Sequence, residues 1–226
     1  MDFPAITAQV DTDFATSVTS MPVNLPASIS SGNLLFAFSE VRNAGTWTVP
    51  SGWVELDSQL GGSSVGELTI FYKIADGAEG ATASWTASVG TSAVWQSVKV
   101  TDWHGTTIPE ASKASGDFTT NPNPPSLTPS WGAEDTLWIE VAGNAATADL
   151  TTDASTNYTG YALNTTSGGG AQAQVSSAHR NLNSSSENPD EMTNAGSIRY
   201  WASFTIAVRP SAGGGGGNTT NFFQMI

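Results

Sequence analysis

One short segment of the chain matches the pattern of a hydrolase nucleophile. Residues 62–66 read Gly-Ser-Ser-Val-Gly and fit G-x-S-x-G, in which the central serine attacks with the help of a histidine and an acid. That chemistry needs a strand before the serine and a helix after it. Residues 67–74 instead alternate like a second strand. We therefore interpret residues 62–66 as a Gly/Ser hairpin loop.

Candidate metal ligands are also few. The chain has no cysteine and only two histidines, His104 and His179, which are too few for a Cys/His zinc site, although a mixed site of histidine and carboxylate stays open. Three acid pairs could hold Ca²⁺ at loop ends, but none has the dense spacing of a calcium loop. They are Asp11/Asp13, Asp149/Asp153 and Asp190/Glu191. We expect no metal, no cofactor and no catalytic residue, and hence a protein that is not an enzyme.

Aromatic residues offer a different kind of site. Sugar rings stack on exposed aromatic faces that have polar neighbours. The candidates for such a glycan contact are Trp47, Tyr158 and Tyr161. The alternative is that these three rings pack in the core or in loops.

Any such site must be positioned by β-strands. Val94, Gln96, Val98 and Val100 fall on one side of an extended segment, 92–103, which predicts a long strand. Only 12% of the residues are charged, and long stretches with helical periodicity are missing. The fold class we expect is all-β, a two-sheet β-sandwich.

The strand pattern occurs twice in the chain. Residues 197–208 repeat the features of 92–103, with Trp201 in the place of Trp95. Three further pairs follow in the same order: 33–38 with 135–140, 50–56 with 155–161, and 68–73 with 175–180. In the first of these pairs we align Leu35 with Leu137 and Phe36 with Trp138. The order of matches predicts a sandwich built from two pseudo-repeated halves.

These patterns divide the chain into a sandwich and a tail. We expect residues 1–210 to form the sandwich, with half-units at about 1–104 and 134–210 joined by a Pro-rich crossover, 105–133. A disordered linker between independent domains is the alternative for that crossover. Residues 211–226 are a Gly-rich tether followed by an apolar peptide. Its large side chains, Phe222, Phe223, Met225 and Ile226, are the predicted partner-docking residues. The alternative is that the tail folds back on its own sandwich or stays disordered.

Charge limits the possible partners. The net charge is −13, and the 7 basic residues are scattered along the chain, which disfavours nucleic acid and anionic membranes. No apolar run is long enough to span a bilayer, and the first residues do not resemble a signal peptide. We expect synthesis in a cytoplasm and no contact with a membrane.

Three motifs give the chain a family resemblance. Residues 32–35 read Gly-Asn-Leu-Leu, residues 50–53 read Pro-Ser-Gly-Trp, and residues 72–79 read Tyr-Lys-Ile-Ala-Asp-Gly-Ala-Glu. In this order they resemble the jelly-roll-like β-sandwich proteins of tailed bacteriophages, over residues 30–105 well and over 135–209 weakly. The resemblance implies a virion protein, as a capsid decoration protein or as a part of a head or tail fibre, usually as a trimer.

The function that we expect from the sequence is therefore structural. It is that of a capsid decoration (cement) protein on the outer surface of a phage capsid, which is made in the host cytoplasm and docks through its C-terminal tail onto the major capsid protein or another virion protein. The expected assembly is a homotrimer. The alternative is a carbohydrate-binding fibre or adhesin module for host attachment.

Overall fold

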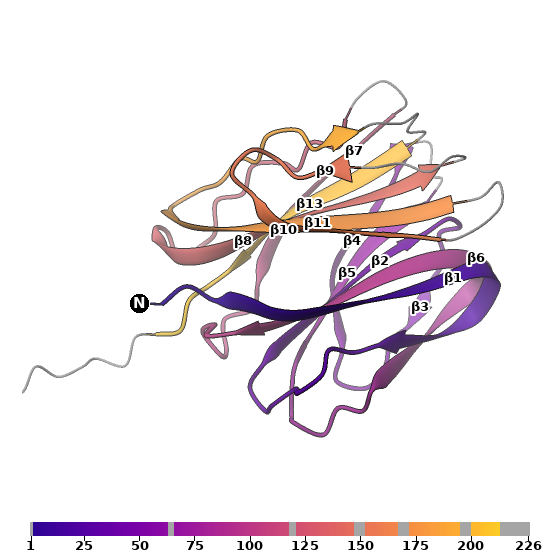
Figure 1. Ribbon diagram of the computed structural model, residues 1–226, viewed down its shortest axis with the longest axis horizontal. Helices are drawn as coiled ribbons and strands as arrows, with labels where there is room; N and C mark the ends of the chain where they lie inside the picture. Colours follow the sequence, from indigo (N-terminus) through magenta and orange to yellow (C-terminus); the bar gives the residue numbers. More distant parts are fainter. Residues whose placement is uncertain are drawn as a thin grey trace, which may run out of the picture.

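The computed structural model describes residues 2–62, 66–117, 121–146, 152–166, 172–194 and 200–212. Within these ranges every regular element is a β-strand, so no helix long and apolar enough to cross a membrane is found there. Figure 1 shows two twisted sheets that pack face to face. This is the all-β sandwich expected from the sequence.

The first half of the chain forms one sheet. Its strands are β1 (Ala5–Asn24), β2 (Leu34–Val41), β3 (Trp47–Thr48), β4 (Val54–Leu60), β5 (Glu67–Ile74) and β6 (Thr82–Thr101). They pair in the order β1-β6-β2-β5-β4, and the short β3 pairs with β6. All of these pairings are antiparallel.

The second half of the chain forms the other sheet. Its strands are β7 (Glu110–Asp117), β8 (Glu134–Ala146), β10 (Thr159–Thr165), β11 (Gln172–Ser184) and β13 (Tyr200–Val208). They pair in the order β10-β11-β8-β13-β7. Two short strands, β9 (Thr152–Asp153) and β12 (Thr193–Asn194), form a separate ribbon.

The two sheets have the same connectivity. We number the long strands of each sheet from one to five in chain order, leaving out the short strands. In both sheets neighbouring strands then follow the order first, fifth, second, fourth, third. The four predicted pairs of repeated segments fall on β2 and β8, β4 and β10, β5 and β11, and β6 and β13. The pseudo-repeat of the two halves is therefore confirmed, and Trp95 and Trp201 are buried on corresponding strands.

Two of the repeat alignments were out of register. The structural equivalent of Trp95 is Ser203, two residues after Trp201, and the alignment of Leu35 was wrong by one residue. Leu34 and Leu137 both belong to the core between the sheets, whereas Leu35 packs on the outer face of its sheet. The correct partner of Leu137 is therefore Leu34, and Trp138 corresponds to Leu35. In these strands apolar residues occupy both faces, so alternation could not fix the register.

The segment 105–133 contains a strand that the sequence analysis did not predict. β7 pairs along its length with β13, and its sequence, Glu-Ala-Ser-Lys-Ala-Ser-Gly-Asp, has no large apolar residue. An edge strand of small side chains carries almost no hydrophobic signal. Beyond β7 the segment crosses the outer face of its own sheet, where Leu127 is buried and Trp131 packs beside it.

Apolar side chains from both sheets fill the space between them. This inner core includes Phe36, Phe38 and Ile70 from the first sheet, and Ile139 and Phe204 from the second. All five are fully buried. Burial of each such side chain stabilises the fold by about 1.5–3 kcal/mol before the entropy cost of ordering the chain. Because each half supplies one sheet, the core depends on both halves.

The outer face of the first sheet carries a second core. β1 and β6 are 20 residues long, and bulges between Phe14 and Val18 let their far ends fold back over this face. Trp85 thereby packs on Trp95, with ring centroids 4.8 Å apart, and on Phe71 at 5.7 Å. The first sheet is thus covered on both faces.

Polar side chains close the two open sides of the sandwich. On one side the Asn164 amide on β10 donates to the carbonyls of Thr12 and Trp95, at 2.9 and 3.0 Å. On the other side Lys113 of β7 pairs with Asp57 of β4 at 2.6 Å. These contacts connect the two sheets along both sides of the sandwich.

Candidate functional site

The three predicted glycan-contact residues do not lie together. Trp47 is half-buried in the aromatic cluster on the first sheet, with its ring centroid 5.4 Å from that of Trp95. Tyr158 is buried and Tyr161 half-buried against the cluster on the outer face of the second sheet. The residues therefore lie on opposite outer faces of the sandwich and form no common platform.

The other sequence candidates are also dispersed. The docking residues Phe222, Phe223, Met225 and Ile226 lie outside the described residues, as does the serine of the G-x-S-x-G pattern. The strand β5 follows that pattern directly. The histidine His104 accepts a hydrogen bond from the backbone N–H of Thr107 at 3.2 Å. Among the described ranges no group of three or more His, Cys, Asp and Glu residues could hold a metal ion.

Two of the sequence motifs, 50–53 and 72–79, meet in space. Lys73 extends over the Pro-Ser-Gly-Trp turn, where its side chain approaches Gly52, a residue with φ of +80°. Its ammonium group pairs with Glu79 at 3.0 Å and with Asp76 at 3.5 Å. The Glu79 carboxylate also accepts the backbone N–H groups of Asp76 and Gly77. The Lys73 side chain therefore holds the turn at residues 50–53 against the turn at residues 76–79.

A groove lies where these motifs meet. Its volume is about 230 Å³. Trp53 and Leu25 contribute apolar surface, and Lys73, Glu79 and Ser51 contribute polar groups. This volume is below the roughly 300–1,000 Å³ that is typical of small-molecule pockets. Trp53 itself is largely covered, because its ring packs on Trp85 with centroids 4.9 Å apart.

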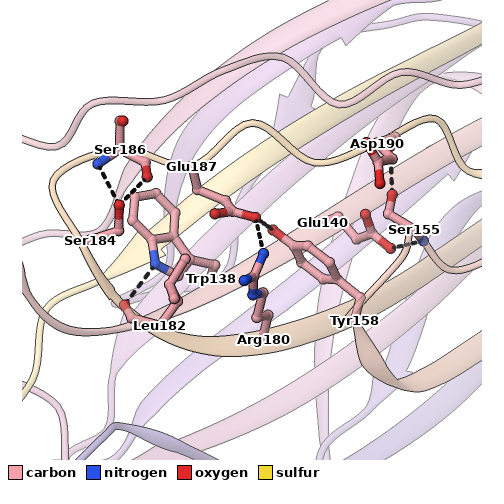
Figure 2. Close-up of polar contacts among 10 residues, drawn as sticks. All are labelled: Trp138, Glu140, Ser155, Tyr158, Arg180, Leu182, Ser184, Ser186, Glu187 and Asp190. Atoms are coloured by element: carbon pink, nitrogen blue, oxygen red, sulfur yellow. Dashed lines mark hydrogen bonds and ion pairs between the residues drawn. The ribbon is translucent and has the colours of Figure 1, made fainter.

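The outer face of the second sheet holds a network of buried acids (Figure 2). Glu140 on β8 is fully buried, and its Oε1 accepts the backbone N–H of Ser155 at 2.9 Å. Its other oxygen, Oε2, has no hydrogen-bond partner. Burial, opposed in part by the Ser155 hydrogen bonds and reinforced by Glu187 and Asp190, raises the pKa of Glu140 to about 7.

The segment 185–192, which we call the strap, ties this network together. From the strap, Glu187 pairs with Arg180 at 2.9 Å, and the Tyr158 hydroxyl donates to the same carboxylate at 3.5 Å. Glu187 and Leu127 also exchange two backbone hydrogen bonds of 2.9 and 3.0 Å. Figure 2 shows these side chains between the strap and the sheet. The network thus holds the strap over the sheet.

The chemistry open to this network is limited by its burial. Glu187 is 7% exposed and Glu140 is not exposed at all. A general acid or base must come within hydrogen-bond reach of a substrate, and both carboxylates instead bond to the protein's own groups. We interpret the network as a structural attachment. The sequence signal was present, since Glu140 interrupts an apolar strand, but its partners are distant in the chain.

Another buried acid, Glu40, lies between the sheets. Glu40 on β2 is 2% exposed, and its Oε2 has no hydrogen-bond partner. Burial and the nearby Glu67 raise the pKa of Glu40 well above its usual value. The pKa of Glu67 is itself raised, by burial and by Glu55. A carboxyl group in this position favours its neutral form.

No family model, no curated protein and no solved structure matches this chain.

Proposed function

We propose that the protein is a non-enzymatic structural protein of a phage virion, a capsid decoration protein that docks through its C-terminal tail. The observation that carries this proposal is the coverage of the sandwich. Its outer faces are packed with apolar clusters, and its two open sides are closed by side-chain contacts. A sandwich covered in this way is better suited to a structural protein than to an enzyme.

Two properties of the sequence support the same proposal. The net charge of −13 keeps the chain soluble and away from the packaged DNA. The apolar residues Phe222, Phe223, Met225 and Ile226 follow a tether with five consecutive glycines. One such short peptide binds weakly, whereas several on one trimer bind strongly through effective concentration.

The test is a co-sedimentation experiment with two targets. Labelled full-length protein is mixed with empty phage capsids that lack it, and separately with host cells. The proposal expects saturable binding to capsids and none after deletion of residues 218–226. Thermal stability should change by less than about 1 kcal/mol on this deletion, since the described core is complete without residues 218–226. Absence of capsid binding by the intact protein would contradict the proposal.

A second candidate function is carbohydrate binding by a fibre or adhesin module. The groove between Trp53, Lys73 and Glu79 is the observation that favours it, because it combines apolar and polar surface in about 230 Å³. A glycan array separates the two functions. The second candidate expects binding that is lost in Ser51→Trp, which fills the groove, and kept in Ser58→Trp on β4 outside it.

A further inference from the structure

Three exposed apolar side chains gather at one end of the sandwich. The described residues have five large apolar side chains with high exposure, and three of these are Val54, Ile74 and Ile108, with exposed fractions of 48%, 42% and 52%. Val54 begins β4 and Ile74 ends β5, while Ile108 lies just before β7. We call these three residues the end patch.

Strand register places Val54 and Ile74 on the same face. Val54 is the direct partner of Tyr72, so both side chains point to the same side of the sheet. Ile74 lies two residues beyond Tyr72 on β5 and therefore also points to that side. This is the inner side, since Tyr72 belongs to the core between the sheets. The two side chains thus lie where the inner core opens to solvent.

Ile108 reaches the same end from the other sheet. Lys113 of β7 contacts Asp57 of β4, and Ser115 contacts Gln59. The two strands therefore run in the same direction along this side of the sandwich. The residues just before β7 are therefore at the same end of the sandwich as the start of β4. Ile108 therefore lies at the same end of the sandwich as Val54, and the end patch draws on both sheets.

The chain leaves the sandwich at this same end. Ser211 donates its backbone N–H to Asp102 at 3.0 Å, and Trp103 bridges to Pro210. The Trp103 indole donates to the carbonyl of Gly32 at 2.8 Å. Gly32 in turn bonds to Ala75, the residue after Ile74, at 2.8 Å. A short series of contacts therefore connects the departure of the tail to the end patch.

The tether has a suitable length for a return to this surface. Nine residues, 213–221, separate Ala212 from Phe222. A Gly-rich segment of that length spans about 15–18 Å on average and at most about 30 Å. An apolar segment on such a tether has an effective concentration near the millimolar range at its own sandwich. At lower protein concentrations, contact within one chain therefore prevails over contact between two copies.

We propose that the apolar segment Phe222–Ile226 of the free protein packs on the end patch of its own chain. The segment supplies four large apolar side chains, and the patch supplies apolar surface that water would otherwise cover. Any other surface that binds this segment has to displace it from the patch. This inference concerns the free protein, so it can fail or hold independently of capsid binding.

Paramagnetic relaxation provides the test. The chain has no cysteine, so a nitroxide on Asn221→Cys labels a single position. We expect methyl resonances of Ile74 and Ile108 to lose most of their intensity, while those of Val89, which is 43% exposed on another part of β6, are retained. The triple variant Val54→Ser, Ile74→Ser, Ile108→Ser should restore the methyl signals of Val100, the neighbour of Leu34 beside Ile74.

A control variant and a mixed sample test whether the tail binds elsewhere or binds a second copy. The control Leu60→Ser, Val89→Ser removes the two other exposed large apolar side chains of the described residues and should leave the broadening unchanged. Mixing isotope-labelled protein without nitroxide with nitroxide-labelled protein without isotope detects contacts between copies. Broadening in the mixed sample as strong as in the doubly labelled sample would assign the patch to a second copy and overturn the proposal. Equal intensities of Ile74, Ile108 and Val89 in every sample would overturn it as well.

Discussion

Gly143 on β8 faces Glu40 on β2 across the interior of the sandwich, and a Cβ atom at residue 143 would overlap with the Oε2 atom of Glu40 and come within 3.0 Å of Leu68. Neither neighbour can move freely, because both are buried. The glycine therefore provides the space in which an unpartnered carboxyl group is accommodated.

Replacement of this glycine should be strongly coupled to Glu40. We expect Gly143→Ala to lower the free energy of unfolding by about 1–3 kcal/mol through overpacking. In Glu40→Ala, Gly143→Ala the cost should be at least about 1 kcal/mol below the sum of the single changes. Urea denaturation measures all three. Gly80→Ala, with no neighbour closer than 3.8 Å, is the control. Additive effects would show that Gly143 does not make room for Glu40.

Glu140 should make stability fall as the pH rises. Its pKa is raised from 4.5 to about 7 in the folded state, so the folded protein retains a proton that the unfolded chain releases. The resulting stability is complete below pH 4.5 and is lost between pH 4.5 and about 7, by up to about 3 kcal/mol. Glu140→Gln should match the parent at pH 4 and exceed it at pH 8.

The control for this pH dependence has the opposite sign. Glu134 pairs with Arg209 at 2.7 Å, and this contact lowers the pKa of Glu134. Its stabilising contribution is present above its unfolded pKa and lost as the pH falls. Glu134→Gln should therefore weaken the protein at pH 7 and have less effect near pH 3. Thermal unfolding over pH 3–8 tests both variants, and parallel curves for Glu140→Gln and the parent would contradict the assignment.

The strap should open when its charge pair is broken. Glu187→Ala leaves Arg180 without its partner beneath the strap, and we expect a loss of about 1–3 kcal/mol. The loss should appear first as local opening, with faster hydrogen exchange at the backbone amides of Leu127 and Glu187. Lys113→Met breaks the more exposed pair with Asp57 and should change stability by under about 1 kcal/mol. Unchanged exchange at Leu127 would rule out the attachment role.

Asn164 should be needed to close its side of the sandwich. Asn164→Ala removes donors to two backbone carbonyls, and we expect a cost of about 1–3 kcal/mol. Asn183→Ala removes an exposed amide that bonds to Asp135 and should cost about 0.5 kcal/mol or less. Chemical denaturation of the two variants gives the comparison, and equal costs would contradict a closing role for Asn164.

Neither half of the chain should fold alone. An isolated 1–105 fragment would expose the inner faces of Phe36, Phe38 and Ile70, so we expect no cooperative unfolding transition from it. Coexpression with 106–226 should restore one transition, because the two sheets then share their core. Circular dichroism with urea measures both samples. A cooperative transition of the 1–105 fragment would mean that the core does not depend on both halves.

The sequence predicted the strands and their repetition but not the polar contacts between them. Alternation and turn residues were sufficient for β2, β5, β6 and β13, because each carries large apolar side chains. β7 was missed because its side chains are small and polar. The network around Glu140 unites residues from β8, the 154–158 turn and the strap, and no local pattern specifies which distant residues will meet. The placement of Trp47 and Tyr158 likewise depended on which segments cover the outer faces.

The shared strand order of the two sheets has a consequence for assembly. Each half-unit has an apolar sheet face that needs a second sheet to cover it. Joining the two half-units in one chain makes their association independent of concentration. It also frees the two faces to diverge, which is visible in the coverage of one outer face by β1 and β6 and of the other by the strap. One polypeptide here corresponds in design to a covalently linked dimer.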